Sequence, residues 1–271
     1  MPQSRIRLWL VFPLIFAAVL LAHLPLLRLP YYWDEAGYYI PAAYDFFRTG
    51  SLIPFSTLSN AHPPLPSLYL ALWWKVFSFA PGVTRVAMCF VAAIALLAVF
   101  QLAIVTTRKA QVAVATVGLT AMYPVWFAQS SLGHADMFAA AATLWAIVFL
   151  LEERMWLAVT CFSLAALAKE TSIVTPLALA GWQVWLAFTA QGLNASTTTK
   201  QGNQRRYRLS TAAQLLLPIV LLACWYAYHW HRTGFVFGNP EYLRYNATAT
   251  LTPLRILLAF AHRVLHITAH M

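Results

Sequence analysis

Acidic residues are scarce in this chain, yet two of the eight stand side by side, Asp34 and Glu35, in the stretch "PYYWDEAGYY" (residues 30–39). The tyrosines and tryptophan around them are typical of a membrane–water interface. A carboxylate at that level can reach both a lipid head group and a molecule arriving from water. Partial desolvation and a like-charged neighbour favour proton uptake by one of the pair, as a general base requires. The plainer interpretation is two solvated loop acids.

Three more polar groups stand where chemistry is conceivable. His62 begins "HPPL", in which two prolines stiffen the entry to a short helix. Asp136 in "SLGHADMF" opens an apolar run, where the helix dipole favours a carboxylate. Lys169 in "LAALAKETS" ends another, and ionisable groups at membrane depth are candidates for function. Each has a structural alternative: a surface histidine, a helix cap, and a Lys169–Glu170 pair that neutralises itself.

The composition shows what must position these residues. Hydrophobic residues make up 61% of the 271 and charged residues 10%, which excludes an ordinary soluble domain. Apolar windows of about 20 residues favour transmembrane helices over a barrel. The net charge of +10 is scattered between apolar runs, so we expect lipid phosphate and membrane lipids as partners and no nucleic acid. Cys89, Cys161 and Cys224 lie within the apolar runs without metal-ligand spacing.

The predicted fold is all-α, a single membrane domain over 1–271 formed by a polytopic transmembrane bundle with interfacial helices on its outer face. Residues 28–85 form its first outer loop. A first apolar stretch from Leu8 to Leu27 is too long for a cleaved signal and is interpreted as a retained anchor. The polar stretch from Asn194 to Arg208 is interpreted as a solvated loop. We predict seven spans, at residues 8–27, 86–106, 110–129, 137–151, 155–168, 172–189 and 211–228.

Residues 65–80 are apolar but short for a span, and we place them along the outer interface. The positive-inside tendency supports this threading, because the basic residues near the span ends then fall on the cytoplasmic side. These are Arg5, Arg7, Arg108, Lys109, Arg154, Lys200, Arg205, Arg206 and Arg208. The chain is thus expected in an inner or plasma membrane, with a cytoplasmic N-terminus and the polar residues described above on the periplasmic or extracellular face.

The C-terminal stretch 252–271 carries its basic and histidine residues at helical spacing. An amphipathic interfacial helix fits this pattern better than an eighth span. A surface helix without chemistry is the alternative to a role in binding an anion.

In order and spacing, these features resemble the C-type integral membrane glycosyltransferases, the group with the protein O-mannosyltransferases and the lipid A aminoarabinose transferases. The matching stretches cover residues 1 to about 185: "WDEAGYY", "HPPLPSLYLALW", "GVTRVAMCFVAAIALL", "SSLGHADMFAAAATLW" and "ALAKETSIVTPLAL". Full members have more spans and often an outer soluble domain, so the chain corresponds to the N-terminal part of such a module or to a compact or truncated homologue.

The resemblance implies inverting transfer of a monosaccharide from a polyprenyl-phosphate-linked donor to a hydroxyl acceptor at the non-cytoplasmic face. It implies Asp34 as the base, Glu35 as its companion and Asp136 near the acceptor or donor site. His62 stands where the family often has a lysine facing the donor phosphate.

Cations could stabilise the charge that develops on the leaving phosphate. The candidates are Arg85, Lys169, Arg232, Arg244 and Arg255, with Arg244 first because it lies in a polar outer segment. No cofactor is indicated, nor a metal, although a divalent metal stays open.

Two other functions fit the same residues. A transporter or flippase for an anionic polyprenyl lipid would line its pathway with these charges, but it predicts internal repeats and broken spans that the sequence does not show. A non-catalytic subunit that only binds the carrier lipid is the third possibility. Proximity of Asp34 to Asp136 separates our threading from one in which residues 65–80 cross the membrane.

Overall fold

A computed structural model describes residues 8–189, 198–246 and 251–269, and this part of the chain is helical, without a strand. The helices are α1 Leu8–His23, α2 Ile40–Thr49, α3 Leu65–Val76, α4 Pro81–Thr107, α5 Ala110–Met122, α6 Pro124–Gln129, α7 Ala135–Leu151, α8 Met155–Ala168, α9 Val174–Thr189, α10 Thr198–Leu215, α11 Leu217–Thr233, α12 Pro240–Asn246 and α13 Pro253–Ala269. Short turns of other helix types are η1 Leu24–Leu26, η2 Glu35–Tyr39 and η3 Glu170–Ile173.

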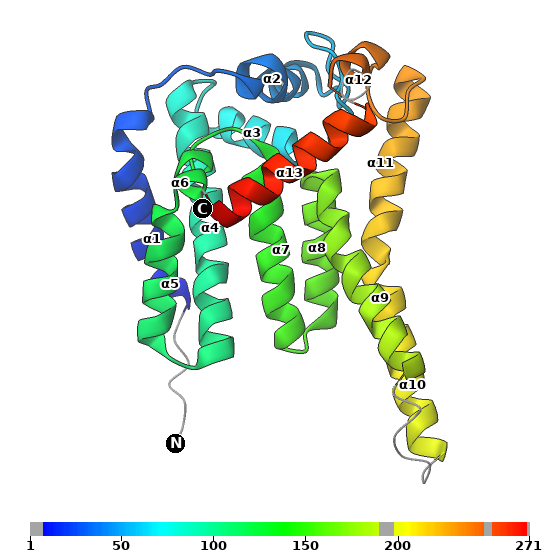
Figure 1. Ribbon diagram of the computed structural model, residues 1–271. Coiled ribbons are helices and arrows are strands. Elements are labelled where there is room, and N and C mark those ends of the chain that lie inside the picture. Colours follow the sequence, from blue (N-terminus) through cyan, green and yellow to red (C-terminus); the bar gives the residue numbers. More distant parts are fainter. Residues whose placement is uncertain (1–7, 190–197, 247–250, 270–271) are drawn as a thin grey trace.

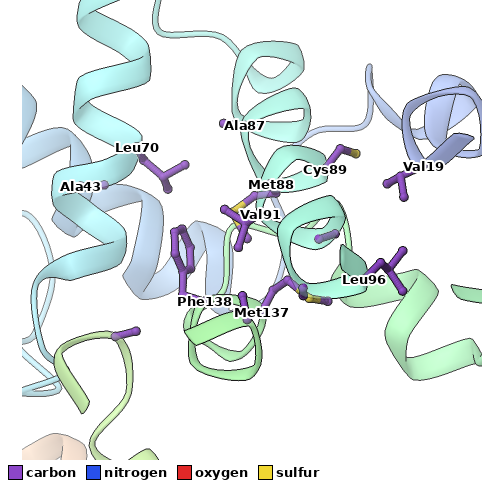
Figure 2. Packing of buried hydrophobic residues seen from close by; sticks show 14 of the residues in the cluster. Val19, Ala43, Leu70, Ala87, Met88, Cys89, Val91, Leu96, Met137 and Phe138 are labelled. Atoms are coloured by element: carbon purple, nitrogen blue, oxygen red, sulfur yellow. The ribbon is translucent and has the colours of Figure 1, made fainter. Parts of the chain in front are cut away.

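Helix α4 is the centre of the bundle and packs against α1, α5 and α7 (Figure 1). Its long run begins with proline in the first turn, where the missing N–H breaks no helical bond, and ends where Arg108 turns left-handed at φ 58°. Figure 2 shows Met88 and Val91 of α4 beside Leu70 of α3 and Phe138 of α7.

Alanines allow the helices of the bundle to approach one another closely. Ala92 and Ala95 of α4, Ala146 of α7 and Ala165 of α8 are completely buried. In helices with apolar surroundings, association depends on close packing, which small side chains permit. The sequence therefore builds this core from many small contacts and few large side chains.

The outer surface of the bundle is apolar. Leu14 of α1 and Leu119 and Met122 of α5 point outward and are more than 70% exposed. Four helical stretches are long and apolar enough to cross a membrane: Leu8–Leu26, Pro81–Thr107, Glu170–Thr189 and Gly202–Thr233. An apolar exterior on helices of this length indicates an all-α membrane protein.

The other predicted spans correspond to shorter apolar helices, Ala110–Met122, Ala135–Leu151 and Met155–Ala168. The helix over the predicted span 110–129 is interrupted, because the chain breaks between α5 and α6. Tyr123 is extended at ψ 125° since it precedes Pro124, whose ring disfavours a helical residue before it.

One correction concerns the predicted loop from Asn194 to Arg208. Residues 194–197 lie outside the described residues, but helix α10 already begins at Thr198. Lysine, glutamine and arginine are good helix formers, and α10 packs along α9, so the polar segment continues the helix instead of looping. Helices α10 and α11 meet at Leu216 and together form the longest apolar stretch.

Helix α3 has 12 residues, a length of about 18 Å, which is short of a hydrocarbon core. It lies with α2 at one end of the bundle (Figure 1). The C-terminal stretch is helical as predicted, in α13, and its described side chains are exposed. Its contact with a membrane surface stays a prediction.

Candidate functional site

Four of the predicted site residues come from segments that meet at the end of the bundle carrying α2 and α3 (Figure 1). Asp34 precedes η2, His62 ends the loop before α3, Asp136 stands in the first turn of α7, and Lys169 follows α8. The short connections at this end of the helices bring together residues that are more than 100 positions apart.

Glu35 forms a buried ion pair with Arg85. The guanidinium donates from Nη1 to Oε1 (2.5 Å) and from Nη2 to Oε2 (2.9 Å), and the two side chains are 0% and 1% exposed. Arg85 also donates to the carbonyls of Ser131 (2.9 Å) and Pro30 (3.0 Å). The N–H of Gly133 donates to Glu35 Oε1 at 2.6 Å.

This network changes the roles predicted for both residues. Arg85 is enclosed and its guanidinium N–H groups donate to protein oxygens. It therefore does not face an open surface where the phosphate of a sugar donor could bind. Glu35, predicted as the companion of Asp34, is likewise enclosed, and its oxygens accept from Arg85 and from the Gly133 N–H. Together they join the segment after α1 to α4 and to the segment before α7, which fixes the turn that carries Asp34.

Asp34 is the half-buried neighbour of that pair. Within the described residues its carboxylate accepts no hydrogen bond and forms no ion pair, although its charge acts on Tyr39, His134 and Tyr242. It caps η2, a turn of π type, which is a rare element often found at functional sites. The predicted base is therefore present in the cluster and its oxygens are not occupied by a neighbouring cation.

Asp136 and Lys169 form a second ion pair, 2.5 Å between Oδ1 and Nζ. Their side chains remain 46% and 26% exposed, in contrast to Glu35 and Arg85. An ammonium has three donors, and one is used here. This pair is open to a further partner.

His62 and Glu170 form a third pair, with 2.8 Å between Nδ1 and Oε2. The sequence suggested that Lys169 and Glu170 neutralise each other, and the structure corrects this. Lys169 is extended (φ −149°, ψ 124°), and successive side chains of an extended backbone point to opposite sides. Each of the two therefore finds its own partner across the site.

Tyr39 lies between the groups of this cluster. Its ring stacks on His62, with centroids 5.7 Å apart, and is 5.4 Å from the ring of His134. Burial, followed by the charges of Asp136, Asp34 and Glu170, raises the pKa of the Tyr39 hydroxyl. Tyr39 is therefore a partly buried residue with the charges of three carboxylates around it.

His134 adds a second ring beside Tyr39. Its Nδ1 lies 3.1 Å from Gln129 Oε1, while its buried Nε2 has no hydrogen-bond partner among the residues that the structure describes. Burial lowers the pKa of this imidazole, against the opposite pull of the carboxylates of Glu35, Asp136 and Asp34. Tyr39, His134 and Glu170 were not predicted as site residues, because an aromatic ring or a second charge in a pair carries no chemical signal until its neighbours are known.

Arg244 and Arg255 differ from the other predicted cations. Arg244 is exposed on α12, 4.0 Å from Glu241. Arg255 is exposed on α13, and the contacts described above do not include it. Helix α12 does border the cluster through Tyr242, whose ring lies 5.3 Å from that of Tyr38 and whose hydroxyl pKa is raised by burial and then by the charges of Tyr38, Asp34 and Glu170.

A buried acid that the sequence did not single out shapes the loop leading to His62. Asp45 Oδ2 accepts the N–H groups of Phe55 and Ser56 and the Ser56 hydroxyl, each at 2.9 Å. Beyond this loop a cavity of about 30 Å³, room for about two water molecules, lies between Tyr39, His62 and Trp225. No three metal-ligating residues gather within the described ranges.

Comparisons of the chain with protein-family models, with curated proteins and with solved structures find no match.

Proposed function

We propose that this chain is a membrane glycosyltransferase in which Asp34 is the general base for transfer of a monosaccharide from a polyprenyl-phosphate donor to a hydroxyl acceptor. The carrying observation is the gathering of Asp34, the Asp136–Lys169 pair and the His62–Glu170 pair around Tyr39 at one end of the bundle. That end is the outer face in the proposed seven-span topology, which counts the three shorter apolar helices as spans and places the N-terminus in the cytoplasm.

The proposed reaction assigns each group a task. The acceptor hydroxyl gives its proton to Asp34 as its oxygen bonds to the anomeric carbon. The bond from that carbon to the phosphate oxygen breaks on the opposite side, the electron pair leaves with the phosphate, and the sugar inverts. Since the leaving group is an anion, no acid is needed there.

Lys169 is the cation best supported as a partner for that phosphate. It is partly exposed and retains donors beyond the one given to Asp136. His62 is already bonded to Glu170, so a phosphate would compete with that carboxylate for it. Arg85 is excluded from the role by its burial against Glu35.

The test is transfer by the purified protein in lipid, with polyprenyl-phosphate mannose and polyprenyl-phosphate aminoarabinose as donors and a membrane lipid extract and serine-containing peptides as acceptors. Asp34→Asn should lower the release of polyprenyl phosphate by about 10² to 10⁴-fold. Its thermal stability should be unchanged, because the carboxylate forms no hydrogen bond or ion pair in the described structure.

Glu153→Gln is the matched control, since it removes an exposed carboxylate in the turn between α7 and α8. We expect the wild-type rate from it. Equal rates for Asp34→Asn and the wild type would contradict the assignment, and movement of the donor across vesicles by the wild type without sugar release would favour a flippase.

A further inference from the structure

The segment that carries His62 is held in a strained conformation. Ala61, directly before it, has a φ of 57°, a left-handed value that disfavours a side chain, and it is buried. His62 is followed by a proline, which restricts it to extended backbone. Strain of this kind persists only where the surroundings enforce it.

Hydrogen bonds enforce this conformation on both sides of Ala61. The indole Nε1–H of Trp225, in α11, donates to the Ala61 carbonyl at 2.9 Å. The Ala61 N–H donates to the Ser59 hydroxyl (3.3 Å), and the His62 N–H donates to Asn60 Oδ1 (3.1 Å). The N–H and carbonyl of Ala61 and the N–H of His62 therefore all have partners.

Ser59 is in turn fixed by the end of α11. The completely buried ring of His229 has Nδ1 2.7 Å from the Phe235 carbonyl, which can only accept, so Nδ1 donates. Its Nε2 forms a hydrogen bond of 2.7 Å with the Ser59 hydroxyl. The Asn239 N–H donates to the Ser59 carbonyl (2.8 Å).

The close approach of the segment around Asn239 to Ser59 depends on a glycine. A side chain at Gly238 (φ 92°) would stand 2.9 Å from the Ser59 carbonyl oxygen. Trp225 and His229 are far from the His62 loop in sequence, and their hydrogen bonds to Ala61 and Ser59 connect α11 to this loop.

We infer that Trp225 and His229 are positioning residues, which through Ala61 and Ser59 hold His62 against Glu170 and Tyr39. The inference that this positioning affects catalysis rests on the proposed function, but the positioning of the loop by Trp225 and His229 does not. It predicts that loosening either bond frees the loop from residue 59 to 62 while the helices remain folded.

Amide hydrogen exchange of the protein in lipid nanodiscs tests directly whether Trp225 restrains the loop. In Trp225→Phe, which retains the ring packing and removes the N–H, the amides of Ala61 and His62 should exchange faster by about fivefold or more, the factor expected from one hydrogen bond. Trp230→Phe, an exposed tryptophan on the same helix, is the matched control and should leave these amides unchanged.

A rescue separates positioning from general damage. Glycine adopts left-handed backbone without strain, so Ala61→Gly added to Trp225→Phe should return exchange toward the wild-type rate. Where the wild type transfers sugar, Trp225→Phe should lower turnover and the double variant should restore it. Restored exchange without restored turnover would overturn the link to catalysis.

Equal exchange of Ala61 and His62 in Trp225→Phe and Trp230→Phe would overturn the inference, whatever the activity. If Trp225→Phe fails to fold, Ser59→Ala replaces it, because it removes the acceptor of the Ala61 N–H and leaves α11 intact. A wild type without transfer activity would instead contradict the proposed function alone, since exchange is measured without substrate.

Discussion

Two kinds of ion pair stand next to each other at one end of this bundle. Glu35 and Arg85 are enclosed and bonded to three further backbone groups, whereas Asp136 with Lys169 and His62 with Glu170 are partly exposed. The chemical types are nearly the same. What differs is whether water, or a substrate, can reach the charges.

This difference in access separates ion pairs that stabilise the fold from pairs that can change partners. Breaking a buried pair leaves a charge without solvent or partner, so the pair behaves as part of the core. A partly exposed pair loses little when it opens, because water replaces the partner. The enclosed pair can keep the Asp34 turn in place, while the open Asp136–Lys169 pair can release Lys169 to an arriving phosphate.

The sharpest way to break the comparison is Arg85→Met. It leaves the Glu35 carboxylate buried and unpaired, and we expect a loss of about 3 to 5 kcal/mol in the free energy of unfolding. Denaturant unfolding in mixed micelles, followed by circular dichroism, measures it. Arg154→Met, at an exposed pair with Glu152, is the control and should cost less than about 1 kcal/mol. Similar losses in both variants would abolish the distinction.

The open pair should show the reverse behaviour. Lys169→Met should change the free energy of unfolding by about 1 kcal/mol or less but lower sugar transfer by about 10²-fold, because it removes a cation at the developing phosphate charge. Transfer kinetics and unfolding are measured on the same preparation. Large destabilisation with unchanged sugar transfer per folded molecule would show that Lys169 stabilises the fold, as Arg85 does, and does not act on the phosphate.

A buried acid without a cation sharpens the comparison further. Asp45→Ala leaves two backbone N–H groups and the Ser56 hydroxyl without their acceptor, and we expect a loss of about 1 to 3 kcal/mol. The midpoint of unfolding should fall accordingly, between the values for Arg154→Met and Arg85→Met. A loss as large as that of Arg85→Met would mean that burial alone, and not the unpaired charge, sets the cost.

The smallest expected effect is a dependence on pH through His134. Its folded pKa is below the ordinary value of 6.5, so the unfolded chain takes up the proton first as the pH falls. The contribution of His134 to the free energy of unfolding is complete above about pH 6.5 and decreases as the pH falls through the folded pKa. His134→Gln should remove this part of the decrease, seen as a smaller difference between unfolding at about pH 7.5 and about pH 5.5. Identical pH profiles for the two proteins would contradict it.

Much of this arrangement was predictable because its signals are local. An apolar run of sufficient length indicates a membrane helix wherever it occurs, as at Leu8–Leu26 and Pro81–Thr107. A polar residue at the end of such a run, like Asp136 or Lys169, must then lie near an end of the bundle. The approach of these two follows from chain order and threading.

Pairing was not predictable in the same way. Nothing in the sequence around Asp34 and Glu35 indicates which side chain turns inward, since this depends on Arg85 arriving from another helix. The separate partners of Lys169 and Glu170 depend on one extended residue, whereas the break before Pro124 could be predicted from the proline itself. Burial and partner choice are properties of the folded chain, and single residues do not carry them.

The wide turn of η2 makes the spacing between Asp34 and helix α2 sensitive to a single deletion. Gly37 sits within that turn, and a side chain there would meet no atom within 4 Å. Gly37→Ala should therefore be tolerated, whereas removal of residue 37 would tighten the turn and rotate everything before it by about 100° about the helix axis. Length variation between α1 and α2 would consequently redirect the aspartate as effectively as replacing it.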